Sequence, residues 1–240
     1  MISIIIPTRN EEKIIERTLT QLKNALTIPH EIIVVDGHST DATVSIAQKY
    51  ADKIVIQDPN RPKTIATGRN QGAEAATGEY IVFFDADCTI PDPDAFFTRA
   101  LAYFDKHPKT VGLCARIKVL PEFATWQDRL VFACVNFTYA FCNNVLEIGA
   151  SGGEFLMIKR SSFVKVGGFK EHLTASEDIN LFYTVSRVGH THLLHSLVVM
   201  HTGRRAHQVG WPLLLWEWFS NTISLIFRHK AASKEWTVIR

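Results

Sequence analysis

Several common protein signatures are absent from this sequence of 240 residues. Its four cysteines, Cys88, Cys114, Cys134 and Cys142, form no CxxC pair and no spacing typical of a zinc site. Scattered thiols in a chain of this length are more typical of a reducing compartment than of a disulfide framework. The cysteine pattern therefore predicts a cytoplasmic protein.

Long apolar runs and an excess of either charge are also missing. No stretch reaches the roughly 20 uninterrupted apolar residues of a membrane-spanning helix. The first residues, MISIIIPT, enter an apolar strand at once, without the basic segment that begins a signal peptide. Lysine and arginine number 26 against 24 acidic residues, for a net charge of +2. This balance argues against a nucleic-acid-binding protein that depends on a broad positive field.

What the sequence does contain is an alternation of apolar runs and amphipathic segments. Near-continuous apolar runs are typical of strands that are buried on both faces. In the first half they cover 2–7, 31–36, 53–57 and 80–85, and helix-period segments lie near 11–25, 40–50 and 64–76, with Asn10 and Thr40 at N-cap positions. The pattern predicts an α/β fold with a mostly parallel, Rossmann-like sheet flanked by helices.

The second half of the sequence is less regular. Helices are predicted near 94–106 and 126–146, from 177 onward and over 211–229, and strands near 111–119, 154–159, 191–194 and 197–201. No internal repeat or linker divides the chain. We therefore predict one domain over 1–208, followed by an amphipathic helical extension over 209–240.

Acidic residues follow two of the predicted strands. Asp85 ends the run YIVFFD and Asp87 comes two residues later, while Asp36 ends the run EIIVVD. Ligands of an open parallel sheet bind beyond the carboxyl ends of its strands, and strand residues two apart share one face. Carboxylates at that edge suit Mg²⁺ or Mn²⁺, and for Asp36 a simple turn or helix cap is an equally good explanation.

Four segments, taken together, resemble the motifs of family 2 glycosyltransferases with the GT-A fold. They are SIIIPTRNEEKIIERTL, EIIVVDGHSTDAT, GRNQGAEAATGEYIVFFDAD and ASEDINLFYTVSRVG, and they follow the order found in that family. The resemblance implies transfer of a sugar from a nucleoside diphosphate sugar to an acceptor, usually with inversion. It also implies a divalent metal, Mn²⁺ or Mg²⁺, as cofactor.

The same resemblance assigns roles to individual residues. Asp85 and Asp87 match the Asp-x-Asp that holds the metal against the diphosphate, and His201 resembles a histidine that completes the metal shell. The residues that it implies for nucleotide-sugar binding are Pro7, Thr8, Glu11, Asp36, Arg69, Asp85, Gly152, Gly153, Arg204 and Arg205. Structural explanations stay open for several of them: a surface cation for Arg69, an ordinary loop for the two glycines and a structural histidine for His201.

Two neighbouring acids, Glu177 and Asp178, stand at the start of a predicted helix. Inversion requires a general base on the face of the sugar opposite the departing diphosphate. The resemblance gives that role to Asp178 and leaves Glu177 to acceptor binding, although acids at a helix start are also favoured as caps. The Gln-x-x-Arg-Trp form of processive synthases is absent, which argues against polymer synthesis.

The segment WPLLLWEWFSNTISLIF (211–227) is apolar on most sides. One narrow polar stripe runs along it, formed by Glu217, Ser220, Asn221 and Ser224. Basic residues lie at and after its end: Arg228, Lys230 and Lys234. Such a helix suits the membrane interface, although a partner subunit or the protein's own core would cover it equally well. We expect peripheral contact of 211–229 with the inner face of a membrane, and a lipid-linked acceptor.

Two other functions remain open at this point. A nucleotidyltransferase that makes nucleotide sugars also has an α/β sheet and metal-binding acids, but its first loop is usually glycine-rich and basic, unlike PTRNEE here. A non-catalytic module that binds sugars or a membrane surface is the other possibility. The acids at positions 85, 87, 177 and 178 argue against it.

Overall fold

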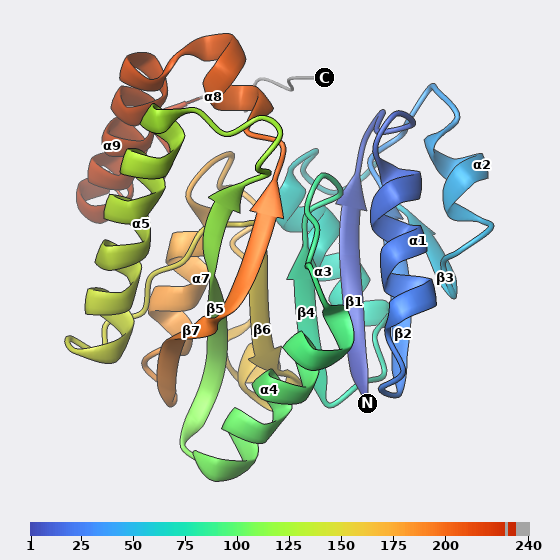
Figure 1. Cartoon of the computed structure of the whole chain (residues 1–240), viewed down its shortest axis with the longest axis horizontal. Helices are drawn as coiled ribbons and strands as arrows, with labels where there is room; N and C mark the ends of the chain where they lie inside the picture. Colours follow the sequence, from blue (N-terminus) through green and yellow to red (C-terminus); the bar gives the residue numbers. More distant parts are fainter. Residues whose placement is uncertain (229, 234–240) are drawn as a thin grey trace.

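The computed structural model describes residues 1–228 and 230–233, and shows a seven-stranded sheet with helices on both faces (Figure 1). The strands are β1 (Ile2–Thr8), β2 (His30–Asp36), β3 (Lys53–Ile56), β4 (Tyr80–Phe84), β5 (Thr110–Val119), β6 (Phe155–Lys159) and β7 (His190–His201). The helices are α1 (Ile15–Ala25), α2 (Thr43–Ala47), α3 (Ile65–Ala75), α4 (Pro93–Lys106), α5 (Trp126–Asn144), α6 (Arg160–Val166), α7 (Glu177–Val185), α8 (Arg204–Val209) and α9 (Trp211–Arg228).

The strand order is β3-β2-β1-β4-β6-β5-β7. Every neighbouring pair is parallel except the two that involve β6, which runs antiparallel to both β4 and β5. The predicted α/β fold with a mostly parallel sheet is therefore confirmed. Because β6 is reversed, its amino end lies at the same edge of the sheet as the carboxyl ends of the other strands.

The sheet is buried on both faces, as its apolar strands require. One core cluster packs β1, β2 and β4 against α1 and α4, and a second packs the opposite face against α3, α6 and α7. Gly72 allows the close approach of α3, because a Cβ at this position would stand 2.3 Å from Ile5 Cγ2.

Some local expectations were wrong. Asn10 and Thr40 do not cap helices: α1 begins at Ile15 and α2 at Thr43, without N-cap bonds from these side chains. The Asn10 side chain instead accepts a hydrogen bond of 2.7 Å from the Thr40 N–H. The two loops at this edge of the sheet thus hold each other, which is a tertiary contact that local sequence does not reveal. The two short strands expected after residue 190 form one strand, β7, and the sequence reading did not foresee α6 and α8.

The last two helices pack on α5, at the end of the sheet beyond β5 and β7 (Figure 1). Trp211 donates a hydrogen bond of 3.0 Å to the buried Asp128, and it packs on Phe132. The polar stripe of α9 faces the protein, because Asn221 and Ser224 are buried. Of the expected 209–240 extension, residues 229 and 234–240, including Lys234, lie outside the described residues.

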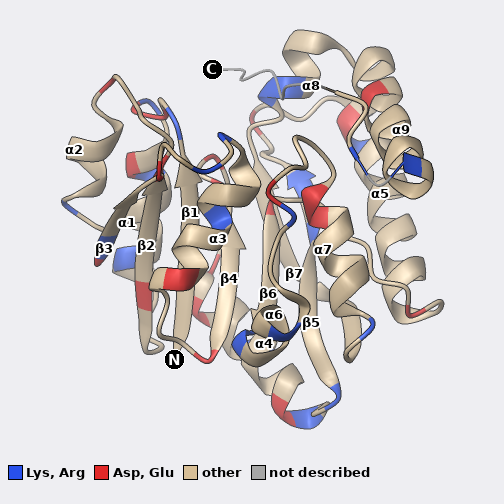
Figure 2. Ribbon diagram, turned by 180° about the vertical axis from the view of Figure 1, so that it is seen from behind, with Lys and Arg blue, Asp and Glu red and all other residues tan. Residues whose placement is uncertain are grey.

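The apolar side chains of α9 consequently face outward. Trp216 is 64% exposed and Phe219 58%, and α5 beside it exposes Phe137 to 72%. Figure 2 shows few charged residues along these two helices. Among the described helices, none is long and apolar enough to cross a bilayer.

Candidate functional site

The parallel strands end at one edge of the sheet (Figure 1), and most of the predicted site residues lie there. Thr8 and Asp36 close β1 and β2 in the same register, and His201 closes β7. Asp85 follows β4, and Glu154 precedes the reversed strand β6. The backbone N–H of Asp85 reaches the Glu154 carbonyl at 3.4 Å, so these two residues lie opposite each other.

Arg69, on α3, is the charged centre of this edge. Its side chain is only 1% exposed, and it donates hydrogen bonds of 2.9 Å to Asp85 and 2.8 Å to Glu177. A third bond of 3.1 Å goes to the carbonyl of Gly153. Burial opposes the charge on the guanidinium, but Asp85, Glu177 and Asp178 outweigh it and raise the Arg69 pKa above its ordinary value. Arg69 is therefore a buried ion-pair partner and not a surface cation.

Five carboxylates lie near one another here, four of them in the field of this guanidinium, and we call them the acid cluster. They are Asp85, Asp87, Glu154, Glu177 and Asp178. Burial, together with the charge of Asp87, raises the pKa of Asp85 to about 6, although its side chain keeps 28% of its surface exposed. Burial and the Asp85 charge raise the pKa of Glu154 to about 7. The cluster carries more negative charge than Arg69 compensates, which favours a cation.

Asp178 and Glu177 are held differently although they are adjacent. Glu177 is buried in its ion pair with Arg69. Asp178 makes a hydrogen bond of 2.7 Å with the Ile179 N–H through Oδ1. Burial and the neighbouring Glu177 charge raise the pKa of Asp178 well above its ordinary value. Ser176, just before them, has a left-handed φ of 60°, which is a strained conformation for serine.

Asp87 belongs to a second set of contacts at the same edge. Thr202 donates a hydrogen bond of 3.0 Å to Asp87, and the Arg204 Nε lies 3.4 Å from it. The same Arg204 bonds both carboxylate oxygens of Glu11, at 2.9 and 2.7 Å. The loops after β1, β4 and β7 are thereby joined through one guanidinium.

The metal-binding hypothesis fits part of this arrangement. Asp85 and Asp87 offer the hard oxygen donors that Mg²⁺ and Mn²⁺ prefer, beside uncompensated negative charge. His201 Nε2 is buried without a hydrogen-bond partner among the described residues, while Nδ1 accepts the Gly203 N–H at 3.3 Å. Within 1–228 and 230–233, however, no three His, Cys, Asp or Glu side chains converge on one ion position. The two aspartates fit a divalent cation, and His201 does not join them in a ready-made ligand set.

The residues predicted to meet the nucleotide lie beside this cluster. Pro7 is next to α3, where a Cβ at Gly68 would stand 3.9 Å from it. Thr8 and Asp36 are both buried. Asp36 accepts the Ser39 N–H at 2.9 Å with one oxygen, and its other oxygen has no hydrogen-bond partner in the described part of the chain.

Three residues predicted to bind the nucleotide sugar, Gly152, Gly153 and Arg205, have contacts within the protein that the sequence did not suggest. A Cβ on Gly153 would stand 2.7 Å from the Arg69 guanidinium, so the buried arginine requires a glycine there. A Cβ on Gly152 would stand 2.3 Å from the Glu154 carboxylate. Arg205 bonds both oxygens of Glu217 on α9.

The sequence reading missed three polar residues at this edge. Glu154 carries an acid into the cluster, Thr202 bonds Asp87, and the half-buried Tyr139 of α5 lies in the field of Asp178 and Glu154. An acid that flanks an apolar strand was the signal used for Asp85. The same signal identifies Glu154 as a site residue only if the antiparallel direction of β6 is known.

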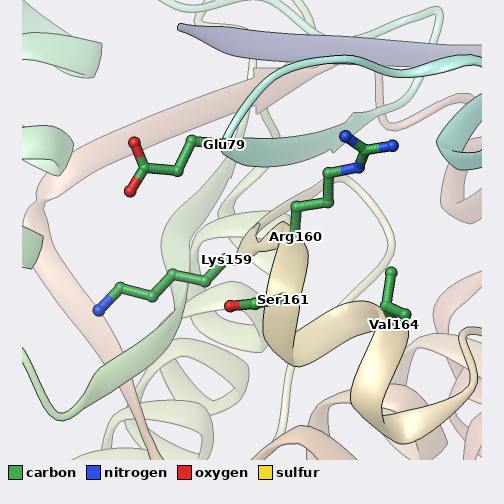
Figure 3. Close-up of a pocket in the computed structure, with 5 residues that line it drawn as sticks. All are labelled: Glu79, Lys159, Arg160, Ser161 and Val164. Carbon is green, nitrogen blue, oxygen red and sulfur yellow. The ribbon is translucent and has the colours of Figure 1, made fainter.

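A hollow elsewhere on the surface is separate from this site (Figure 3). It is lined by Glu79, Lys159, Arg160, Ser161 and Val164. Glu79 precedes β4 and Lys159 ends β6, so the hollow lies at the opposite end of the two strands from Asp85 and Glu154.

Strand order and the acidic edge together define a GT-A-type α/β protein. More specifically, the chain belongs to glycosyl transferase family 2, because the model of that family matches residues 3–167, more than half of the sequence.

Characterised relatives are distant and longer. Succinoglycan biosynthesis protein ExoA of Rhizobium meliloti is 28% identical over 90% of this chain and 66% of its own length. The O-antigen chain rhamnosyltransferase RfbN of Salmonella typhimurium is 24% identical over 79% of this chain and 62% of its own. The chain thus spans less than two thirds of these relatives.

Solved structures support the fold. A mannosyltransferase of Pyrobaculum calidifontis, determined with GDP-Man and Mn²⁺, aligns over 95% of this chain and 64% of its own, at a TM-score of 0.70 and 21% identity. TarS of S. aureus in complex with UDP-GlcNAc aligns over 82% of this chain and 57% of its own, at a TM-score of 0.64 and 21% identity.

Proposed function

We propose that this protein is an inverting glycosyltransferase that moves a sugar from a nucleoside diphosphate sugar to an acceptor hydroxyl or phosphate. Family membership and the acid cluster around Arg69 support this proposal. The observation that carries it is the meeting of Asp85, Arg69 and Asp178 where the parallel strands end. That edge is the ligand-binding edge of open α/β sheets.

Donor binding is proposed for the loops after β1, β2 and β4. Asp36 has one oxygen without a hydrogen-bond partner among the described residues, which suits a base N–H or a ribose hydroxyl. Pro7 and Thr8 lie at the end of β1, where Thr8 is in register with Asp36. Glu11 bonds Arg204, which also contacts Asp87. These four residues are proposed to line the donor site. A GDP-Man complex and UDP complexes among similar folds support a nucleoside diphosphate sugar as donor class.

Asp85 and Asp87 would hold a divalent cation, Mn²⁺ or Mg²⁺, at the diphosphate. When bound, that cation stabilises the negative charge that builds up as the diphosphate leaves. Mn²⁺ is present in two of the similar structures, which supports this cofactor. His201 remains a candidate further ligand, because its Nε2 is buried and without a partner in the described residues.

Asp178 is the proposed general base. Glu177 is engaged by Arg69 at 2.8 Å, so using it as a base would break a buried ion pair. The raised pKa of Asp178 makes that carboxylate a stronger base. In the reaction, the acceptor O–H proton passes to Asp178 as the acceptor oxygen bonds the anomeric carbon. The bond from that carbon to the diphosphate oxygen breaks on the opposite side.

The outward apolar side chains of α5 and α9 are proposed to contact a membrane from the cytoplasmic side. Exposed apolar patches of this kind mark interaction surfaces, and an interfacial site would bring the enzyme to a lipid-linked acceptor. Arg205 then acts as an anchor for α9 through Glu217.

Product analysis of the wild type and of variants at the adjacent residues Asp178 and Glu177 tests the proposed chemistry. The wild type is incubated with GDP-mannose or UDP-N-acetylglucosamine, Mn²⁺ and a membrane lipid extract, and the released nucleotide is identified. A glycosyltransferase releases a nucleoside diphosphate, whereas a nucleotidyltransferase would form or consume pyrophosphate. We expect Asp178→Asn to lower transfer by about 10²- to 10⁴-fold, with donor affinity unchanged.

Glu177→Gln is the matched comparison. It removes a charge from the Arg69 pair, so its main expected effect is lower stability, with residual transfer above that of Asp178→Asn. If Asp178→Asn keeps full transfer and Glu177→Gln abolishes it without unfolding, the base is assigned to the wrong residue.

A further inference from the structure

Glu154 is the member of the acid cluster that neither the sequence motifs nor the proposed reaction explains. It stands immediately before β6, where Phe84 pairs with Phe155, and the next position brings Asp85 opposite Glu154. Phe84 and Phe155 belong to the core cluster under α1 and α4. Because side chains alternate along a strand, Asp85 and Glu154 project to the other face, where Arg69 lies.

The position of the Glu154 carboxylate is fixed by its neighbours. A Cβ on Gly152 would stand 2.3 Å from Glu154 Oε2 and 3.1 Å from Ile117 Cδ1, so the carboxylate lies against the glycine loop, which itself packs on β5. Its charge acts on Asp178 as well as on Tyr139, and it is itself acted on by Asp85 and Asp87. Glu154 therefore lies close both to the aspartates proposed for the diphosphate and to the proposed base.

The other acids of the cluster are engaged by donors or cations of the protein. Arg69 binds Asp85 and Glu177, Thr202 and Arg204 contact Asp87, and the Ile179 N–H bonds Asp178. The Glu154 carboxylate is approached by its own backbone N–H. In the part of the chain that the structure describes, no donor from another residue bonds it. A carboxylate that is partly removed from water without such partners is costly, and a ligand that supplies O–H groups offsets the cost.

We propose that Glu154 is a specificity residue that accepts a hydrogen bond from a hydroxyl of the sugar being transferred. The inference rests on the proposed function, because a sugar that reacts with inversion must sit between the diphosphate and the base. Glu154 lies close to both of these groups. A diphosphate oxygen would need a proton or the proposed cation between it and this carboxylate, whereas a sugar hydroxyl donates a hydrogen bond to it directly.

Paired titrations separate the sugar from the nucleotide. Binding of UDP, UDP-glucose, UDP-N-acetylglucosamine, GDP and GDP-mannose is measured calorimetrically with Mn²⁺, for the wild type, Glu154→Gln and Glu154→Ala. For the donor that the wild type prefers, we expect both variants to bind the free diphosphate as the wild type does. Glu154→Ala loses about 10- to 100-fold in affinity for the nucleotide sugar, as for a hydrogen bond to a charged group, and Glu154→Gln loses less because its amide oxygen still accepts.

Titrations with monodeoxy forms of that donor sugar then identify the hydroxyl that Glu154 bonds, in the manner of a double-mutant cycle. One of them should bind the wild type as weakly as Glu154→Ala binds the full sugar, and lose nothing further in the variant. If the variants lost equal affinity for the free nucleoside diphosphate and for the nucleotide sugar, the proposal would be overturned, because Glu154 would then bind the metal or the phosphates. Unchanged affinity for all ligands would overturn it too. If the wild type binds none of the five nucleotides, the proposed function itself fails, before Glu154 is involved.

Discussion

The guanidinium of Arg69 donates a hydrogen bond of 2.9 Å to Asp85, joining α3 to the end of β4 inside the protein. Because the arginine is only 1% exposed, its charge depends entirely on its carboxylate partners. Arg69 binds Asp85, a proposed metal ligand, and also binds Glu177 at the start of α7. The same arginine therefore contributes both to the stability of the fold and to the geometry of the site.

Replacement of Arg69 by methionine should be strongly destabilising. It leaves the partly buried Asp85 and the buried Glu177 without their cation, and breaking a buried pair from one side typically costs about 3–5 kcal/mol. Urea unfolding at pH 7 measures the loss. Arg61→Met is the control, because Arg61 pairs with Glu171 and with the exposed Glu74, and we expect at most about 1–2 kcal/mol there. Equal losses for the two variants would contradict the central place given to Arg69.

Two glycines of α3 should respond oppositely to alanine. At Gly72 the new Cβ would stand 2.3 Å from Ile5 Cγ2 and 2.9 Å from Val35 Cγ2, and overpacking of a core typically costs about 1–3 kcal/mol. At Gly68 the nearest atom is 3.7 Å away, so alanine fits and gains up to about 1 kcal/mol of helix propensity. Thermal unfolding of both variants checks this, and a stable Gly72→Ala would mean that α3 packs less closely on β1.

Glu31 should contribute to stability in a pH-dependent way. Burial opposes its charge, but bonds from Lys53, Ser3 and Thr77 outweigh it and lower the Glu31 pKa to about 2. A lowered pKa stabilises the folded state above the ordinary value of 4.5, and this stabilisation is lost as pH falls from there toward 2. Glu31→Gln should therefore cost about 2–3 kcal/mol at pH 7 and little near pH 2.

Unfolding of the Glu31 variant and of the wild type between pH 2 and pH 7 gives the comparison. Since Glu31 lies at the amino end of β2, away from the site edge, nucleotide binding should be unchanged. A stability difference that does not shrink toward low pH would contradict the ionic origin of the effect.

The apolar face of α9 should be required for membrane contact. Substitution of Trp216, Phe219 and Phe227 by glutamine removes exposed apolar surface and leaves the buried Trp211 contact with Asp128 intact. The wild type should float with anionic liposomes, and the triple variant should stay in solution. If neither floats and the wild type is an oligomer that the substitutions dissociate, the face is a subunit interface, and the lipid-linked acceptor loses its support.

The sequence predicts a site residue correctly where the signal for it lies within one strand or motif, and fails where it depends on contacts between distant segments. Asp85 and Asp36 each end an apolar strand, so a single strand was enough to place them at the sheet edge. Glu154 precedes a strand, and only the antiparallel pairing of β6 with β4 brings it to the same edge. Arg69 was read from a family motif, but its complete burial depends on α7, more than 100 residues away in the sequence.

The last helix illustrates the same limit. Its polar stripe was visible in the sequence, but a stripe does not tell which side meets the protein. The buried Asn221 accepts hydrogen bonds from the backbone N–H groups of Ala232 and Ser233. The partly buried Glu217 bonds Arg205. These partners turn the polar side inward, so that the apolar side remains exposed.

Metal-dependent nucleotide binding at Asp87 tests the central claim most directly. Titrations of GDP and UDP are carried out with and without Mn²⁺ for the wild type, for Asp87→Asn and for the exposed control Asp105→Asn. The wild type and the control should bind one nucleotide at least tenfold more tightly with Mn²⁺, and Asp87→Asn should lose that gain while its unfolding stays close to that of the wild type. An Asp87→Asn protein that keeps the full Mn²⁺-dependent gain would show that the diphosphate and its metal are not held at this edge of the sheet.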